Sequence, residues 1–146
     1  MIHIALCDDN IDELSHLVQL LNYYRIEKNI HCEYATFTNG FDLIAALEKG
    51  KHFDIFLLDI MMPGYTGIQV AKEIRTFDQA APIVFFTSSS EFAVQSYTVK
   101  AINYVLKPIS KDSFFITLDE VFNQLTIEQE TDLLIVKSTE GIQKIR

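Results

Sequence analysis

The sequence predicts an α/β fold with a doubly wound, five-stranded parallel sheet. Short apolar runs alternate five times with helical patterns between residue 2 and about residue 125. Such alternation is typical of parallel sheets whose helices cover both faces through right-handed crossovers. The run Phe53–Leu58 is apolar almost throughout, as expected for a strand that is buried on both faces of such a sheet.

The five predicted strands are short, are rich in β-branched or aromatic residues, and stop where polar residues begin. They are Ile2–Cys7, His31–Phe37, Phe53–Leu58, Pro82–Phe86 and Ile102–Leu106. None of them is long enough to be confused with a helix of ordinary length, so the change of pattern after each one marks an element boundary.

A helical pattern follows each strand, with apolar residues at spacings of three and four. Asn10 or Asp12 is expected to cap the first helix, because short polar side chains accept from the free amides of a first turn. Asn39 precedes the second helix, and Gly50 is well placed to end it. The last helix starts near Ser110. The apolar residues that define the five helices are Leu14, Leu17, Val18 and Leu21; Phe41, Leu43, Ile44 and Leu47; Ile68, Val70, Ala71 and Ile74; Phe92, Val94 and Tyr97; and Phe114, Phe115, Leu118, Val121, Phe122 and Leu125.

Composition and charge restrict the class of protein. The 146 residues are 49% hydrophobic and 22% charged, which suits one globular domain. With 12 Lys and Arg against 20 Asp and Glu, the net charge is −8, and an excess of acids disfavours stand-alone nucleic-acid binding, which needs clustered Lys and Arg. Cys7 and Cys32 give no disulfide framework and fit a reducing compartment. Without a signal peptide or an apolar run of ~18 residues, we expect a cytoplasmic protein with no membrane partner.

Acids, a hydroxyl and an ammonium follow four of the five predicted strands. Asp8 and Asp9 follow the first strand, Asp59 the third, Thr87 the fourth and Lys107 the fifth. Ligands of open parallel sheets bind at the carboxyl ends of the strands, so these side chains are expected to converge. Three carboxylates repel one another unless a cation lies between them, and oxygen ligands favour a hard cation such as Mg²⁺. A carboxylate in such a site can also accept a phosphoryl group as an aspartyl phosphate.

Each of these residues has a structural alternative when it is taken singly. Asp8-Asp9 suits a helix cap, Asp59 suits a turn, and Lys-Pro is common in loops. The joint placement of all five residues at strand ends favours one shared site.

Four motifs resemble the receiver domain of bacterial two-component response regulators. They are Asp8-Asp9, the segment Asp59–Gly67, Thr87-Ser88 and Lys107-Pro108, and the resemblance covers residues 1 to about 125. It implies a flavodoxin-like (βα)₅ fold. We also expect a cis peptide bond between Lys107 and Pro108, because the ammonium must turn back toward Asp59 as the chain leaves the fifth strand.

The resemblance assigns a role to each site residue. It implies that a sensor histidine kinase transfers a phosphoryl group to Asp59. Thr87 is then the switch hydroxyl, Lys107 the phosphate-binding ammonium and Tyr104 the aromatic switch. The ligands implied for Mg²⁺ (or Mn²⁺) are Asp8, Asp9, Asp59 and the backbone carbonyl of Met61.

The last residues are similar to a more specific family. The segments 101–108 and 133–141 resemble LytTR-type (LytR/AlgR-type) transcriptional regulators, in which a receiver precedes an all-β DNA-binding domain. We therefore expect a receiver domain over 1–125, a linker over 126–132 and the first strands of a truncated C-terminal domain, a short β extension, over 133–146. Contact with DNA would come only through the missing part of that domain. The alternative is an extra hairpin of the receiver itself.

The predicted function is a phosphorylation switch that catalyses only its own phosphotransfer and dephosphorylation. Phosphorylation is expected to remodel the surface between Ser90 and Leu125 and to pair two receivers as a homodimer. The alternatives are a stand-alone receiver, an aspartyl-phosphate phosphotransferase or phosphatase, and a phosphorylation-independent binding module. The phosphatase is disfavoured because Met61 stands where such enzymes generally need a second acid, and the intact acids, Thr87 and Lys107 disfavour the binding module.

Overall fold

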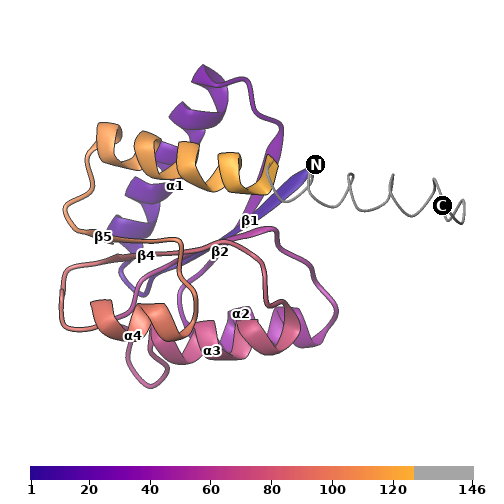
Figure 1. The fold of residues 1–146 in the computed structure, drawn as a ribbon, viewed down its shortest axis with the longest axis vertical. Coiled ribbons are helices and arrows are strands. Elements are labelled where there is room, and N and C mark those ends of the chain that lie inside the picture. Colours follow the sequence, from indigo (N-terminus) through magenta and orange to yellow (C-terminus); the bar gives the residue numbers. More distant parts are fainter. Residues whose placement is uncertain (127–146) are drawn as a thin grey trace, which may run out of the picture.

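Five parallel strands form one sheet, which confirms the predicted fold class. The computed structural model describes residues 1–126 of the chain, so most of the predicted linker and all of the β extension at 133–146 lie outside the described residues. The strand order is β2-β1-β3-β4-β5 (Figure 1). The strands are β1 (Ile2–Cys7), β2 (Cys32–Phe37), β3 (Ile55–Leu58), β4 (Ile83–Thr87) and β5 (Asn103–Leu106).

Helices cover both faces of the sheet (Figure 1). On one face lie α1 (Ile11–Glu27) and the last helix, residues 111–126. On the other face lie α2 (Gly40–Glu48), α3 (Gly67–Phe77) and α4 (Ala93–Thr98). Among residues 1–126 no helix is both long and apolar enough to cross a membrane.

Short polar side chains start the first three helices. Asn10, and not Asp12, caps α1, and Asn39 caps α2. Thr66 and Gln69 form a reciprocal capping box at the start of α3, which satisfies two amides that the helix itself leaves free. These caps fix where α1 and α3 begin, after a short turn beyond β1 and after the loop that follows β3.

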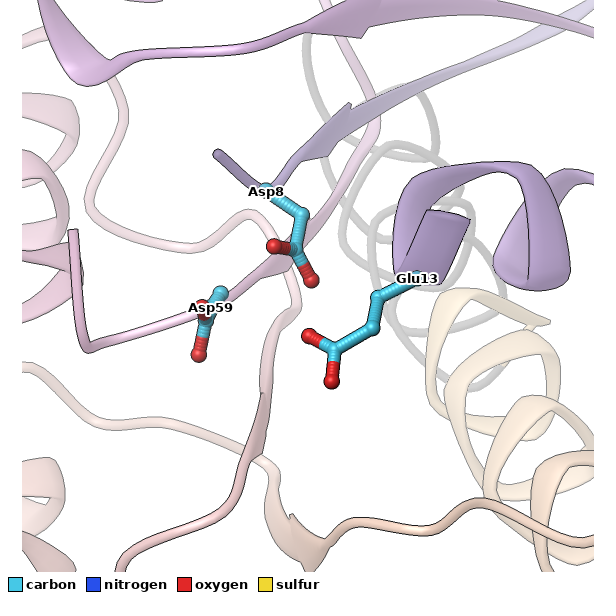
Figure 2. Close-up of side chains that lie close together, drawn as sticks. All are labelled: Asp8, Glu13 and Asp59. Atoms are coloured by element: carbon cyan, nitrogen blue, oxygen red, sulfur yellow. The ribbon is translucent and has the colours of Figure 1, made fainter. Parts of the chain in front are cut away.

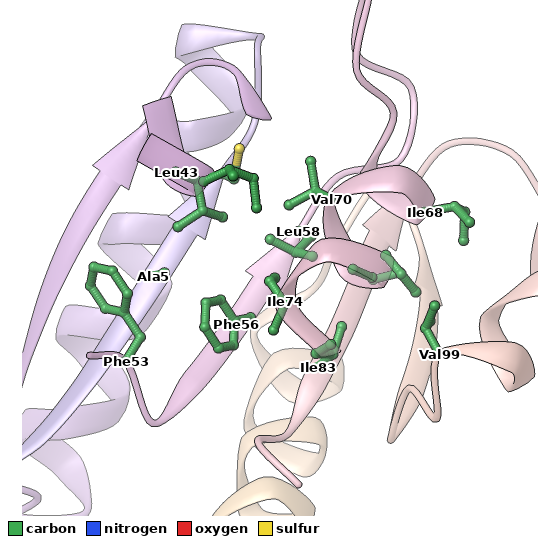
Figure 3. Packing of buried hydrophobic residues seen from close by; sticks show 14 of the residues in the cluster. Ala5, Leu43, Phe53, Phe56, Leu58, Ile68, Val70, Ile74, Ile83 and Val99 are labelled. Carbon is green, nitrogen blue, oxygen red and sulfur yellow. The ribbon is translucent and has the colours of Figure 1, made fainter. Parts of the chain in front are cut away.

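The alternation of side chains along the strands divides the core into two layers. Ala5, Cys7, Phe56 and Leu58 face α2 and α3 (Figure 3), while their neighbours Ile4, Leu6, Ile55 and Leu57 face α1 and the last helix. The layers contain one buried free cysteine each, Cys7 and Cys32 respectively.

Element boundaries differ from the prediction by at most two residues for the strands. Phe53 precedes β3 rather than opening it, although its ring is buried in the core. Inside α1, Leu20 and Tyr24 are buried while Val18 is only partly buried. The fourth helix, α4, has six residues and leaves the apolar side chains of Val94 and Tyr97 77% and 82% exposed.

Candidate functional site

The register of the sheet places two acids side by side at its carboxyl edge. Cys7 of β1 pairs with Leu58 of β3, and the amide of Asp59 donates to the carbonyl of Cys7 at 2.9 Å. Asp8 and Asp59, the next residue of each strand, are consequently neighbours. Both are buried, with exposed fractions of 0% and 5%.

A third acid, Glu13 of α1, completes a cluster with these two (Figure 2). One carboxylate oxygen from each of Asp8, Glu13 and Asp59 lies within 4.8 Å of the others. Lys107 enters the cluster from the end of β5: its Nζ lies 2.7 Å from Asp8 Oδ2 and 3.6 Å from Asp59 Oδ2, and it also forms an ion pair with Glu13. One ammonium against three carboxylates leaves two negative charges uncompensated.

Burial and crowding of like charges disfavour ionisation of the two buried acids. Burial and then the charge of Asp8 raise the pKa of Asp59 from 3.8 to about 6. Burial also raises the pKa of Asp8, although the hydrogen bond from Lys107 opposes this. For Lys107, burial lowers the pKa, but the hydrogen bonds to Asp8 and Glu13 outweigh burial and raise it. The lysine therefore stays charged while the acids are energetically strained.

The loop after β3 holds the Asp59 carboxylate in place. Asp59 Oδ1 accepts from the amide of Ile60 at 2.8 Å, and the carbonyl of Ile60 accepts from the amide of Gly67 at 2.9 Å. A Cβ atom on Gly67 would collide with the backbone carbonyl of Asp59. Only glycine can start α3 this close to the acid. Met61, between them, has a half-exposed side chain.

One residue, Ser89, connects the two predicted switch side chains. The Ser89 amide donates to Oγ1 of the buried Thr87 at 3.5 Å. The Ser89 carbonyl accepts a hydrogen bond from the hydroxyl of Tyr104. The ring of Tyr104 lies 6.3 Å from that of Phe85 and is partly buried. A movement of Thr87 that shifts the Ser89 backbone would therefore alter the hydrogen bond between the Ser89 carbonyl and Tyr104.

The structure brings together most, but not all, of the residues that the sequence singled out. Asp8, Asp59 and Lys107 meet, and the Lys107 amide donates to the carbonyl of Thr87 at 2.8 Å. The Lys107–Pro108 bond is cis, as expected. Asp9 is exposed and is not one of the three clustered acids, whereas Glu13, which no sequence motif pointed to, is one.

The donor set suits a hard divalent cation. It consists of carboxylate oxygens, two of the three acids are buried, and their charges repel. In an octahedral Mg²⁺ shell with bonds of about 2.1 Å, opposite ligands lie about 4.2 Å apart, and the three carboxylate oxygens lie no more than 4.8 Å from one another. Asp8 and Asp59 are the buried acids within reach of such an ion, whereas the Glu13 carboxylate pairs with Lys107.

Comparison with known proteins identifies one family. A family model described as "response regulator receiver domain" matches residues 4–119. The sensory transduction protein LytT of Oceanobacillus iheyensis is 33% identical over 153 residues, which cover 99% of this chain and 59% of that protein. The positive alginate biosynthesis regulatory protein of Pseudomonas aeruginosa is 32% identical over 101 residues, 69% of this chain and 38% of that protein. The chain thus spans less than two thirds of the length of these curated relatives.

Solved structures agree with the fold. The response regulatory domain of mrkE from Klebsiella pneumoniae superposes with a TM-score of 0.74 at 24% identity, over 88% of this chain and 99% of that chain. The response regulator protein TrrA from Thermotoga maritima, solved in complex with Mg(2+)-BeF, has a TM-score of 0.65 at 28% identity, over 83% and 99% of the two chains.

Proposed function

The chain belongs to the family of response regulator receiver domains, and we propose that it is a phosphorylation switch with Asp59 as phosphoacceptor. The observation that carries the proposal is the strained acidic cluster: Asp59 is buried, is fixed by the Ile60 amide, and lies 3.6 Å from an ammonium. In the proposed reaction a sensor histidine kinase is the donor. An oxygen of Asp59 forms a bond to phosphorus while the bond from phosphorus to the histidine nitrogen breaks, and the imidazole keeps the electron pair and takes up a proton.

The side chains around Asp59 position and neutralise the transferred group. Phosphoryl transfer depends mainly on such positioning and charge neutralisation. Lys107 is the fixed cation, and Thr87 offers a hydroxyl at the end of the neighbouring strand. Asp8 and Asp59, with Asp9 and the Met61 carbonyl from the flanking loops, are proposed to hold Mg²⁺ or Mn²⁺. The bound ion would neutralise the acids and the phosphoryl oxygens together.

The proposed response runs from Thr87 to Tyr104. In the unphosphorylated structure, Thr87 Oγ1 accepts a hydrogen bond from the Ser89 amide. When the Thr87 hydroxyl moves to donate to a phosphoryl oxygen, the Ser89 amide must move with it or bind another acceptor. The Ser89 carbonyl then shifts relative to the hydroxyl of Tyr104. The phosphoryl group thereby favours one of two arrangements of the α4–β5 surface. In the favoured arrangement, two receivers are proposed to dimerise through this surface.

The proposed output is transcriptional. The relatives named above are longer proteins, and the name of the one from Pseudomonas aeruginosa denotes a regulatory protein. The segment 133–141 resembles the first strands of a LytTR-type DNA-binding domain. On this proposal the switch acts in the cytoplasm, and DNA contact belongs to the part of such a protein beyond the receiver. A stand-alone receiver is the alternative.

Incubation with acetyl phosphate and Mg²⁺, followed by intact-mass measurement, tests the phosphoacceptor. We expect the wild type to gain the mass of one phosphoryl group and Asp59→Asn to gain none. Asp54→Asn is a matched control, because Asp54 lies at the opposite end of β3 and hydrogen-bonds the amide of His3. An undiminished adduct in Asp59→Asn would refute the assignment.

A further inference from the structure

Glu13 reaches the acidic cluster because its usual local partner is already occupied. Asn10 caps α1 and accepts from the Glu13 amide at 3.1 Å. A Glu at this third helical position commonly turns back to the amide of the cap residue. Here that amide donates instead to Asp8 Oδ1 at 2.9 Å. The Glu13 carboxylate is therefore left to bind Lys107.

The ammonium of Lys107 binds Asp8 and Glu13 rather than Asp59, the proposed phosphoacceptor. It donates to Asp8 at 2.7 Å and to Glu13, while Asp59 Oδ2 at 3.6 Å is beyond hydrogen-bonding distance. A lysine has three donors in all, and this side chain is only 9% exposed. Two of the three donors are thus directed away from the proposed phosphoacceptor.

Of the two acids, Glu13 is the one placed to release the lysine. The Asp8 side chain is fully buried and bound to the Asn10 amide, whereas the Glu13 side chain is 44% exposed. A hollow of about 210 Å³ between α1 and the loop after β5, bordered by His16 and Ile109, adjoins Glu13 and Lys107. A released Glu13 carboxylate has room to turn into it and to be hydrated.

We propose that Glu13 is a positioning residue that restrains Lys107 in the unphosphorylated protein and must release it before the ammonium can bind a phosphoryl oxygen on Asp59. This inference rests on the proposed function. The phosphoryl group carries more negative charge than one carboxylate, so it draws Lys107 across as Glu13 turns to water. Glu13 thus opposes activation without touching the phosphoryl group.

The affinity for beryllofluoride, an analogue of the phosphoryl group, measures this restraint. At saturating Mg²⁺ we expect Glu13→Gln to bind it about fivefold more tightly than the wild type, the upper end of what a partly exposed ion pair is worth. Glu27→Gln is the matched control, since Glu27 lies on the same helix, pairs with Lys111 at 3.8 Å and loses the same charge. It should bind as the wild type does. Shifts of backbone amide resonances report binding in each variant.

A charge-preserving variant separates restraint of Lys107 from general repulsion of an anion. Glu13→Asp keeps the charge but shortens the side chain by one methylene, so it should hold Lys107 poorly and also bind beryllofluoride more tightly. Wild-type affinity in Glu13→Asp would overturn the inference in favour of general repulsion. Calorimetry with Mg²⁺ alone gives a second check: a fall in affinity of about tenfold or more in Glu13→Gln would make Glu13 part of the metal site, as a ligand or as a partner of a ligand, and would also overturn the inference.

The outcomes distinguish the inference from the function on which it rests. If the wild type fails to bind beryllofluoride, the proposed function falls and the restraint falls with it. If the wild type binds and Glu13→Gln binds equally well, the restraint alone is refuted. Tighter binding by both Glu13 variants, with unchanged Mg²⁺ affinity and an unchanged Glu27→Gln control, supports it.

Discussion

The two sides of the sheet's carboxyl edge are built very differently. On the β1–β3 side every residue of β3 is buried, and the acids sit between helices of 17 and 11 residues that begin at side-chain caps. On the β4–β5 side, β5 is an edge strand with no fully buried residue, and α4 has six residues and lacks a side-chain cap. Crowded charge is thus held by firmly packed backbone, whereas the proposed response passes from the buried strand β4 to the lightly packed β5 and α4.

This difference has a physical reason. Buried like charges push the surrounding backbone apart, so only well-packed elements can keep Asp8 and Asp59 at a fixed separation. A short helix with exposed apolar residues has few contacts to lose, so it can open or shift at low cost in free energy. The contrast predicts that substitutions near the acids change global stability, whereas substitutions on α4 leave it nearly unchanged.

The largest effect is expected from crowding the acidic side. Gly67→Ala should destabilise the fold by about 3 kcal/mol or more, because the added methyl overlaps backbone atoms of Asp59 and Ile60 that have little room to move. Urea unfolding followed by circular dichroism measures the change. A loss below about 1 kcal/mol would show that the loop after β3 yields as easily as α4.

A smaller effect of opposite sign is expected from removing charge there. The pKa of Asp59 is about 6 in the fold against 3.8 as its ordinary value, so the folded chain binds the proton more tightly. The free energy of unfolding of the metal-free protein therefore falls as pH rises between these values. Asp59→Asn removes this loss and should be more stable than the wild type by about 2 kcal/mol at about pH 7.5, with the difference shrinking toward pH 4. Urea titrations in a chelator at several pH values test this, and a difference that does not depend on pH would contradict it.

At the opposite, amino edge of the sheet, Arg75 at the end of α3 ties this helix to the segments that precede β4 and β5. Its guanidinium donates to the carbonyls of Val99 at 2.7 Å and Ala81 at 2.8 Å, and it also reaches Lys100. Arg75→Ala should cost about 1.5 kcal/mol, because it leaves these carbonyls without a charged donor. Hydrogen exchange should quicken most between residues 99 and 103. Lys72→Ala, an exposed change on the same helix, is the control, and equal effects of the two variants would refute a specific tie.

The smallest effect is expected on α4 itself. Tyr97→Ser should change the free energy of unfolding by less than about 0.5 kcal/mol, because the tyrosine is 82% exposed. The same urea assay measures it. A loss comparable to that in Arg75→Ala would mean that α4 contributes to the core after all.

The sequence predicts the parts of this molecule that follow from local periodicity. All five strands could be anticipated, as could the start of the second helix after Asn39 and a cap for the first helix at either Asn10 or Asp12. The meeting of Asp8, Asp59 and Lys107 could also be anticipated, because the strand ends of a parallel sheet share one edge. The family resemblance added the roles of these residues, which only the experiments above can test.

What could not be predicted depends on where side chains turn in space. Glu13 reads as an ordinary acid in a first helical turn, and its path to Lys107 exists only because Asp8 occupies the Asn10 amide. The close approach that makes Gly67 essential joins backbone segments eight residues apart. The apolar spacing around α4 indicated a helix, but spacing alone does not reveal that the helix has only six residues or that β5 is an edge strand.

Each of the two core layers contains one buried cysteine, so the rate at which each thiol is alkylated reports how often its layer opens. Cys7 belongs to the layer under α2 and α3, and Cys32 to the layer under α1. Burial raises the pKa of both thiols, that of Cys7 to about 12 with further help from the neighbouring carboxylates. Neither thiol can react with an alkylating reagent until its own layer opens. The order in which the two cysteines are labelled under native conditions will therefore tell which face of the sheet separates first.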